Sequence, residues 1–577
     1  MLERIRELIG EKLGDGEFEV LLASPPAGGE GRGHLSTNAA FALAKETRKP
    51  PMSAADELKK YLEEKGTNLF SKIEVAEPGF INFWVKLEVI QKEFLKIVGA
   101  GENWGQPLKP ASQVRARVIV EYSQPNIAKP MHVGHLRSTI IGDALANILE
   151  FAGCEVIRWN YLGDWGTQFG KVIAAYKLWG DKKGVENAPV EVLASLYARF
   201  HEEVKQDPAL EVRGREEFRK LETGDKENRE LWEWFKEESI KELNKIYTLL
   251  GIKFDEWIGE SFYEKKLPSL IESLLKNGIA KESEGAVIVP LEKFNLPPAL
   301  IRKSDEGTLY LTRDIANLEY RLKEYKADSI LYVVDNGQSL HFQQLFAIAE
   351  ILGLKGKFIH VKFGLVLGED LKRLSTRAGN HIALLEVINE AVARARKIIE
   401  EKQPDMTAVD KEKVAQVVGI GALKYNDLSQ SRVADITFDW DKMLSLQGNS
   451  APYLQYTYAR LRSILRKADL PAEALAKEGE LPKLKVEAIE KEADLRLILK
   501  LVLFPEVIKE VSESYLPHQL ANYLYDLARA INDYYEKEPI LKVEESLRGA
   551  RLHLIKTASE TLKTGLGLLG IGVPERM

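Results

Sequence analysis

The sequence predicts an α/β protein: a domain built on an open parallel sheet, preceded by a small α+β domain and followed by an all-α helix bundle. Three observations support this fold class. Strand-like and helix-like segments alternate over residues 113–380, as a parallel sheet with crossover helices requires. The first strand-like run, 115–122, leads into a turn rich in glycine and histidine that opens a helix. After residue 382 the pattern is almost wholly helical.

The N-terminal domain is predicted to span residues 1–110 and to end near Pro107 and Pro110. Residues 35–45 predict a helix with an apolar stripe, and residues 75–85 alternate like a strand that follows a turn. Short strands mixed with helices are typical of an α+β domain.

The sheet domain is predicted over residues 111–380. Its middle part, about 172–306, is mostly helical in pattern and highly charged, so we expect an insertion that splits the domain. Strands of the sheet are expected at 115–122, 157–164, 329–335 and 357–367.

Two helical regions complete the chain, at 381–446 and 447–577. The second carries long amphipathic helices, separated by a stretch near 470–484 that is rich in Lys, Glu and Pro. Helices of this kind bury one apolar stripe each, which favours a bundle.

Composition excludes several classes of protein. With 577 residues, the chain is long enough for three or four domains. Its single cysteine, Cys154, excludes internal disulfides and Cys-based zinc sites, so no protein-bound structural metal is expected. No apolar run reaches the ~20 residues of a membrane helix, and the first residues do not resemble a signal peptide. We therefore expect a cytoplasmic protein. A net charge of −6 argues against general nucleic-acid binding but allows a local basic face.

The first predicted strand, 115–122, is followed by a His-x-Gly-His turn formed by His132, Gly134 and His135. A strand that passes through such a turn into a helix is suited to hold phosphate, because backbone N–H groups at the helix start face the anion. Two imidazoles can donate to developing negative charge, and glycine allows close approach of the backbone. The competing interpretation is a pair of histidines that only cap the helix.

The residues around this turn, Ser-Gln-Pro-Asn-Ile-Ala-Lys-Pro-Met-His-Val-Gly-His-Leu-Arg-Ser-Thr, resemble the first signature of arginyl-tRNA synthetases. These are class I enzymes, and their version of the turn is the HIGH motif. The resemblance extends over essentially the whole chain. It implies a Rossmann-type catalytic domain at 111–380, an N-terminal domain that contacts the D-loop corner of tRNA, a stem-contact region at 381–446 and an anticodon-binding domain at 447–577.

The same resemblance implies the reaction. L-Arginine would be ligated to tRNA(Arg) through an arginyl-adenylate, with ATP supplied as its Mg²⁺ complex. Arginine activation would wait for bound tRNA, and the protein would act as a monomer without a membrane partner.

A second signature is expected at residues 369–380, which look like a Lys-Met-Ser-Lys loop. The first lysine of that pattern falls on Arg373 and the second on Thr376. Family members with this loss carry a lysine ahead of the HIGH motif, where Lys129 stands, although an exposed loop lysine is the simpler interpretation. The residues expected to act on the phosphates are His132, His135, Lys129, Lys372, Arg373 and Arg377, with Gly134, His341 and Ser375 at the nucleotide.

An arginine pocket needs carboxylates that face the guanidinium fork. Residues 309–314 match the family pattern Tyr-x-x-x-Asp, which indicates Tyr310 and Asp314, and Glu121 at the first strand's end supplies a second acid. In the family, three further positions lie near the α-amino and carboxylate groups of the amino-acid substrate. In this sequence they fall on Ser123, Asn126 and Gln338. A further family block at 163–170 offers Asp164 and Gln168 as substrate contacts, or else only a packed loop.

Two groups of side chains suit contact with tRNA. Phe80 and Asn82 match positions that stack on an unpaired base and read its edge. In the helical end, tyrosines beside an arginine suit unpaired anticodon bases. The residues concerned are Tyr453, Tyr456, Arg460 and the terminal Met577. Phe80 alone is equally compatible with packing in the sheet, and tyrosines at helical spacing are more often core residues.

Two other functions stay open from the sequence. One is another HIGH-containing enzyme that transfers nucleotidyl groups. The other is a tRNA-binding homologue that has lost catalysis, which the altered second signature allows.

Overall fold

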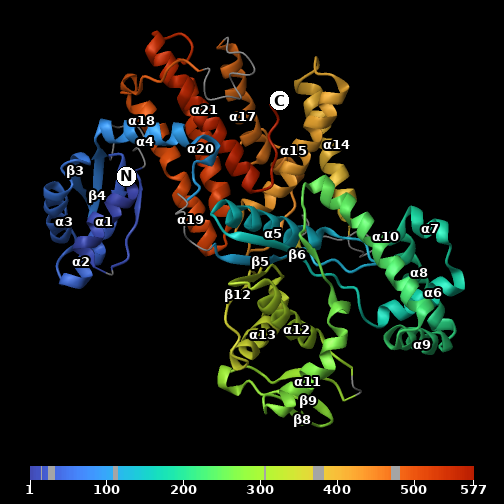
Figure 1. The fold of residues 1–577 in the computed structure, drawn as a ribbon. Helices are drawn as coiled ribbons and strands as arrows, with labels where there is room; N and C mark the ends of the chain where they lie inside the picture. Colours follow the sequence, from blue (N-terminus) through green and yellow to red (C-terminus); the bar gives the residue numbers. More distant parts are fainter. Residues whose placement is uncertain (15, 24–32, 108–114, 305–306, 368–381, 469–480) are drawn as a thin grey trace.

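The N-terminal part of the molecule, blue in Figure 1, is an α+β unit. We describe a computed structural model that covers residues 1–577 except 15, 24–32, 108–114, 305–306, 368–381 and 469–480. Four strands in the order β1-β2-β4-β3 form its antiparallel sheet. Its elements are α1 (Leu2–Leu13), β1 (Val20–Leu22), β2 (Leu35–Thr37), α2 (Ala39–Thr47), α3 (Pro51–Lys65), β3 (Phe70–Ala76), β4 (Phe80–Val85) and α4 (Leu87–Ala100).

The prediction of a helix over residues 35–45 is wrong for residues 35–37, which form a strand. Leu35 is fully buried and pairs with Phe83 of β4, so Leu35–Thr37 forms strand β2. The helix begins only at Ala39. Local propensity favoured the helix, but pairing with a strand far along the chain decides the conformation.

The central sheet is parallel throughout, which confirms the predicted fold class. Its strand order is β12-β11-β5-β6-β7, so the chain starts in the middle, builds outward through β6, and returns to the other side of β5. Open α/β sheets bind ligands at the carboxyl ends of strands where the order reverses, here between β5 and β11. The strands are β5 (Arg117–Glu121), β6 (Glu155–Asn160), β7 (Glu256–Trp257), β11 (Ser329–Tyr332) and β12 (Lys357–His360).

Helix α5 (Val133–Phe151) starts at the His-x-Gly-His turn and is buried along most of its length. It lies between the sheet and the C-terminal helices (Figure 1). Its Arg137 donates through Nε to Asp427 Oδ2 at 2.9 Å and through Nη1 to the Ala434 carbonyl at 3.0 Å. The turn is thereby fixed to the helical half of the molecule. Helices α12 (Tyr310–Tyr320) and α13 (Ser339–Ile351) complete this domain.

The insertion contains more than the predicted helices. Its helical part comprises α6 (Thr167–Trp179), α7 (Lys182–Asn187), α8 (Pro189–Gln206), α9 (Ala209–Thr223) and α10 (Lys226–Leu250), at the right of Figure 1. An antiparallel sheet then follows α11 (Leu267–Lys276), with strands β8 (Lys281–Ser283), β9 (Ala286–Val289) and β10 (Ala299–Arg302). This sheet was missed because its strands are only three or four residues long.

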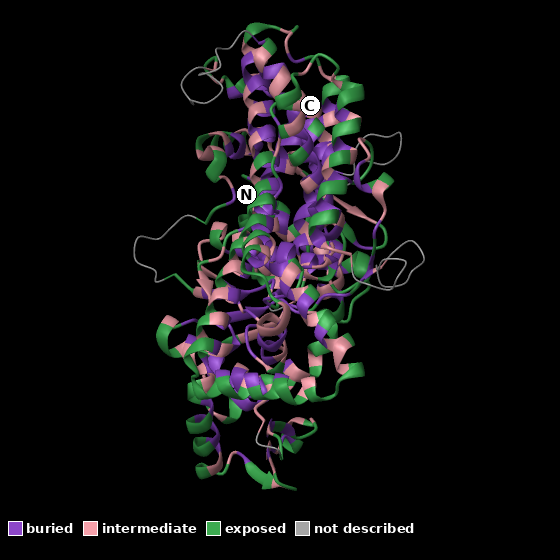
Figure 2. Cartoon of the chain, turned by 90° about the vertical axis from the view of Figure 1, so that its right-hand side faces the viewer, coloured by how far each residue is buried: buried purple, intermediate pink, exposed green. Residues whose placement is uncertain are grey.

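The C-terminal half is helical, as predicted, apart from the short parallel pair β13 (Val366–Leu367) and β14 (Ile436–Thr437). Figure 2 shows buried residues running through the middle of the molecule, where these helices meet the sheet domain. None of the helices in the described ranges is long and apolar enough to span a membrane. The helices are α14 (Leu384–Lys402), α15 (Ala408–Leu428), α16 (Trp440–Met443), α17 (Ala451–Lys467), α18 (Glu492–Val502), α19 (Phe504–Ser514), α20 (Pro517–Lys537) and α21 (Glu545–Leu568).

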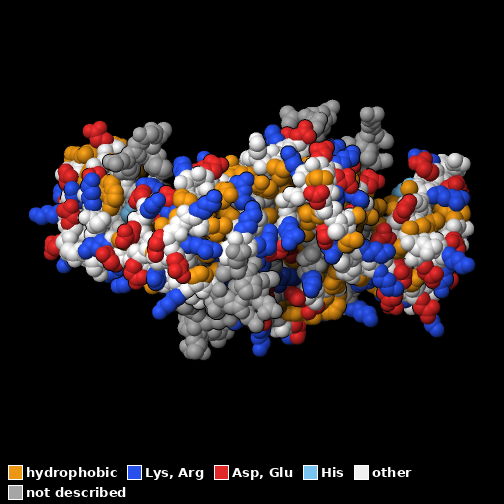
Figure 3. Space-filling view, turned by 90° about the horizontal axis from the view of Figure 1, so that it is seen from above, with side chains coloured by type: hydrophobic (Ala, Val, Ile, Leu, Met, Phe, Trp, Pro, Cys, Tyr) orange, Lys and Arg blue, Asp and Glu red, His pale blue; other side chains and the backbone are white. Residues whose placement is uncertain are grey.

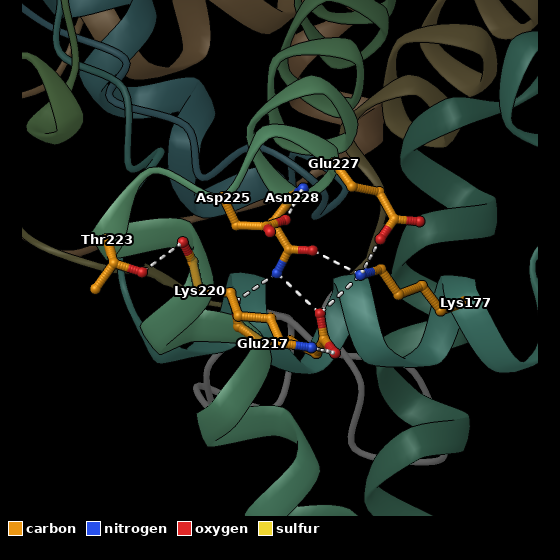
Figure 4. Close-up of polar contacts among 7 residues, drawn as sticks. All are labelled: Lys177, Glu217, Lys220, Thr223, Asp225, Glu227 and Asn228. Carbon is orange, nitrogen blue, oxygen red and sulfur yellow. Dashed lines mark hydrogen bonds and ion pairs between the residues drawn. The ribbon is translucent and has the colours of Figure 1, made fainter.

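A buried polar network joins three helices of the insertion (Figure 4). Glu217 of α9 accepts hydrogen bonds from Lys177 of α6 at 2.8 Å and from Lys220 at 2.9 Å. Asn228 of α10 donates to the same carboxylate at 2.9 Å. Burial alone raises the pKa of Glu217, but these donors outweigh it and lower the pKa from 4.5 to about 2.

Glu217→Gln should destabilise the protein at neutral pH by about 1–3 kcal/mol, because a charged acceptor of several hydrogen bonds is lost. A lowered carboxyl pKa stabilises the fold above the unfolded value and loses that effect as pH falls towards 2. The difference in melting temperature between wild type and variant should therefore be clear at pH 7 and shrink below pH 4. Glu202→Gln, which changes an exposed partner of Lys205, is the control. Equal melting temperatures at pH 7 would contradict the assignment.

Candidate active site

A cavity of about 280 Å³ opens at the edge of the sheet between β5 and β11. Its walls come from the end of β5, the start of α5, the segment after β11 and the segment that leads into β13. The lining includes Ser123, Gln124, His132, Gly134, His135, Asp335, Gln338 and Leu365. Ser123 and Gln124 have φ of 75° and 53°, a left-handed conformation that is costly for residues other than glycine and is concentrated at functional sites.

The two histidines of the turn cap helix α5. His132 Nδ1 accepts from the backbone N–H of Gly134, and His135 Nδ1 accepts from the backbone N–H of His132, both at 3.1 Å. Both histidines therefore cap the helix, and this capping is compatible with a role at phosphate. Because Nδ1 is an acceptor, the neutral ring carries its proton on Nε2, which is then a donor. A Cβ at position 134 would lie 2.8 Å from the His132 ring, so a larger residue there would displace this ring from its capping position.

The cations expected at the phosphates are only partly described. Lys129 is exposed, with Nζ 5.5 Å from the ring centre of Tyr197 on α8 of the insertion. The remaining predicted residues of the second signature, Lys372, Arg373, Ser375 and Arg377, lie outside the described residues.

The carboxylate of Glu121 is buried and has a partner within the protein. It forms an ion pair with Arg321 and accepts from Gln124 Nε2 at 2.6 Å. The Arg321 guanidinium lies 4.3 Å from the ring centre of Trp159. Arg321 opens a π-helical turn at the end of α12, a type of turn that is frequent at functional sites. The sequence offered no signal for Arg321, because its partner lies two hundred residues earlier in the chain.

Asp314 and Tyr310 lie one turn apart on α12, as predicted. Tyr310 is 62% exposed, whereas Asp314 Oδ2 is 2.6 Å from His341 Nε2. Burial alone lowers the pKa of His341, but the hydrogen bond and the charge of Asp314 outweigh it and raise the pKa above the ordinary value of 6.5. The histidine predicted at the adenosine is thus bonded to the acid predicted for arginine.

Glu260, which the sequence analysis did not select, is another buried acid of this region. It follows β7 and is only 8% exposed. Burial first, then the nearby charges of Asp164 and Asp314, raise its pKa from 4.5 to about 8, against the opposing effect of Arg313. Glu121, Asp314 and Glu260 together form the acidic cluster of the site.

Three further predicted residues have defined surroundings. Ser123 Oγ is 2.6 Å from the hydroxyl of Tyr247, within a buried network. Gln338 ends a short 3₁₀ turn and lines the cavity. Asn126 pairs with Gly163 in an isolated parallel bridge, and a Cβ at position 163 would collide with the Asn126 side chain at 2.1 Å.

The segment at 163–170 is held by hydrogen bonds and by an ion pair. Asp164 is fully buried and accepts from Lys236 Nζ at 2.6 Å and from the hydroxyl of Ser261 at 2.8 Å. Gln168 donates to the Trp165 carbonyl at 2.9 Å. Asp164 therefore joins this loop to α10 and to the segment that carries Glu260.

Two surface hollows contain the residues predicted for tRNA. Phe80 and Asn82 line a hollow of about 390 Å³ on the N-terminal sheet, where Phe80 is exposed and Asn82 is buried. Tyr456, Arg460 and Met577 line an open groove of about 530 Å³, together with three further basic residues, Arg466, Lys467 and Arg576. Lys and Arg side chains gather on the middle of the face shown in Figure 3, which carries the C-terminal helices. Tyr453 does not line the groove, and its hydroxyl accepts from Asn532.

Comparison with known families accounts for almost the whole chain. Residues 103–440 match the family model described as tRNA synthetases class I (R), catalytic domain. Residues 3–85 match the arginyl tRNA synthetase N-terminal domain, and residues 454–577 match the DALR anticodon binding domain.

Individual proteins are similar over their full length. Proteins named Arginine--tRNA ligase from Alkaliphilus metalliredigens and Clostridium perfringens are 40% and 42% identical, over 100% of this chain and 99% of each relative. The solved structure of the Thermus thermophilus arginyl-tRNA synthetase has a TM-score of 0.82 at 29% identity, with full coverage of both chains. The arginyl-tRNA synthetase structure from Plasmodium falciparum also gives 0.82, at 27% identity and with 100% and 99% coverage.

Glu260→Gln should raise the melting temperature, by roughly 2–4 °C for each kcal/mol recovered. A carboxyl group with a pKa raised to about 8 makes folding increasingly unfavourable between the unfolded value near 4.5 and pH 8. The advantage of the variant should therefore grow from pH 5 to pH 8 and then level off, as measured by thermal unfolding at several pH values. The exposed Glu272→Gln is the control. A constant difference across this range would show that Glu260 is not held as a buried acid.

Proposed function

The chain belongs to the arginyl-tRNA synthetase family, and from that premise we propose how its site carries out the reaction. The protein ligates L-arginine to tRNA(Arg) with ATP as the second substrate. One observation carries the assignment of the site: the His-x-Gly-His turn and the acidic cluster lie at the same edge of the sheet. A place for phosphates and a place for a guanidinium are therefore adjacent. The second candidates, an inactive homologue and a different nucleotidyl transferase, are not favoured.

In the first step the carboxylate of arginine attacks the α-phosphate of ATP, and pyrophosphate leaves. Such a reaction depends on positioning and on neutralising charge, with little covalent work for side chains. The start of the long helix α5 places the positive end of the helix dipole at the phosphates, and His132 and His135 donate through Nε2. Lys129 supplies a cation beside the turn. Mg²⁺ would arrive with ATP and be held mainly by the phosphate oxygens.

The acidic cluster recognises the side chain of arginine. Glu121 already has Arg321 as its partner, so Asp314 and Glu260 are the acids that receive the guanidinium, while Glu121 adds negative charge beneath them. Exposed Tyr310 closes over the substrate. Ser123, Asn126 and Gln338 bind the α-amino and carboxylate groups and so aim the carboxylate at ATP.

In the second step a ribose hydroxyl of tRNA attacks the carbonyl carbon of the arginyl-adenylate, the ester bond to tRNA forms, and AMP leaves. The hollow at Phe80 suits a base from the D-loop corner, and the basic groove at Tyr456, Arg460 and Met577 suits the anticodon. Asn82 is buried, so it reads a base only at the edge of the hollow. Tyr453 accepts a hydrogen bond from Asn532, which accepts one from Arg460 of the groove, so Tyr453 helps to position Arg460. A single subunit suffices for all these contacts, which favours a monomer; the cytoplasmic location stays a prediction.

Arginine-dependent exchange of pyrophosphate into ATP should appear only when tRNA(Arg) is added. Bound tRNA would complete the site before the first step occurs. The assay compares the full chain with and without tRNA(Arg), using lysine in place of arginine as the control. Equal exchange without tRNA, or a preference for lysine, would refute the proposed function in this form.

Lys129→Ala should lower turnover by ~100-fold or more, the scale of one lost transition-state donor. Single-turnover measurements with saturating ATP separate this effect from weaker ATP binding. Lys205→Ala, which removes an exposed lysine at the end of α8, is the matched control. A near-normal rate for Lys129→Ala would assign the working cation to another residue.

A further inference from the structure

Tyr161 lies at the ligand-binding edge of the sheet, directly after the last residue of β6. Strand β6 pairs with β5 in the register Glu121 opposite Trp159, so Tyr161 stands just beyond the acid at the end of the neighbouring strand. Its ring centre is 6.0 Å from the Arg321 guanidinium and 6.3 Å from the ring of Tyr263. Tyr161 is therefore part of the wall around the acidic cluster.

The hydroxyl of Tyr161 is buried and has no hydrogen-bond partner among the residues that the structure describes. Among the neighbouring buried tyrosines, Tyr332 shares this feature, whereas Tyr263 and Tyr247 do not. Tyr263 donates to Asn317 Oδ1 at 2.8 Å, and the hydroxyl of Tyr247 lies 2.6 Å from Ser123 Oγ. Because native proteins satisfy nearly all buried polar groups, an unpartnered hydroxyl at a binding edge indicates a group that a ligand completes.

The charges around this hydroxyl point to the kind of ligand. Burial raises the pKa of Tyr161 well above its ordinary value, and the carboxylates of Asp314, Glu260 and Glu121 add to that effect. The phenol therefore stays neutral and keeps both a donor and an acceptor. Glu121 already pairs with Arg321, so the ligand group complementary to Asp314 and Glu260 is a cation with several N–H donors. A planar guanidinium, with five donors in a fixed fork, fits this description better than an ammonium group.

We propose that the Tyr161 hydroxyl is a direct contact for the guanidinium of arginine and a specificity-determining residue of this site. The oxygen accepts one guanidinium N–H, while the phenol proton is donated to one of the adjacent carboxylates. The acids attract any cation by their charge. Tyr161 adds a hydrogen bond whose geometry fits a guanidinium. This proposal rests on the arginine pocket assigned above.

Tyr161→Phe in the full chain tests it, because this change removes the hydroxyl and little else. The KM for arginine in tRNA charging should rise about 10-fold, the effect of one hydrogen bond to a charged group. We expect kcat, the KM for ATP and the melting temperature to stay near the wild-type values. Tyr523→Phe, which removes a buried hydroxyl in the C-terminal helices, should leave the KM for arginine unchanged.

Asp314→Asn distinguishes a failure of the arginine pocket as a whole from a failure of the Tyr161 contact alone. A raised KM for arginine in Asp314→Asn with an unchanged KM in Tyr161→Phe would overturn the role of Tyr161 and leave the pocket in place. An unchanged KM in Asp314→Asn would refute the pocket, and the role of Tyr161 with it. A Tyr161→Phe protein with a lower melting temperature and equal losses for all substrates would show that the residue is only structural.

Discussion

The site depends on the buried guanidinium of Arg137, two residues after the His-x-Gly-His turn. Its contacts with Asp427 and with the carbonyls of Leu365 and Ala434 hold helix α5 against α15 and against the segment that enters β13. Burying such an ion pair is costly unless every donor has a well-placed acceptor, and here the backbone supplies the additional acceptors. The phosphate turn, the segment that enters β13 and the helical half of the molecule thereby keep one fixed arrangement.

In contrast to the buried Arg137 ion pair, the acidic cluster lowers the stability of the fold. We attribute this cost to the proposed function of the cluster. Glu260 is buried, forms no ion pair with the residues that the structure describes, and has its pKa raised to about 8. The contact with Asp314 raises the pKa of His341. In the function proposed above, a cationic substrate relieves the cost of these buried acids when it binds. The same principle explains the left-handed backbone of Ser123 and Gln124, which the ends of β5 and α5 hold in place.

Features encoded in neighbouring residues could be predicted from the sequence, whereas features made by distant residues could not. The turn from His132 to His135, the pair Tyr310 and Asp314, and the alternation of the sheet domain are all local patterns. Arg321, Glu260 and Tyr161 gain their roles only when separate strands and helices meet at one edge of the sheet. Strand β2 was missed for the same reason, since its conformation is set by β4.

The acidic cluster should lose protons when a guanidinium enters it. Calorimetric titration of L-arginine near pH 7, repeated in two buffers of different ionisation enthalpy, counts the protons released. We expect a release of up to about one proton per arginine, because Glu260, with a pKa raised to about 8, is protonated near pH 7 in the free protein, and a guanidinium beside it favours the carboxylate. Equal heats in the two buffers would mean that arginine binds without changing these groups, and would contradict the proposed site.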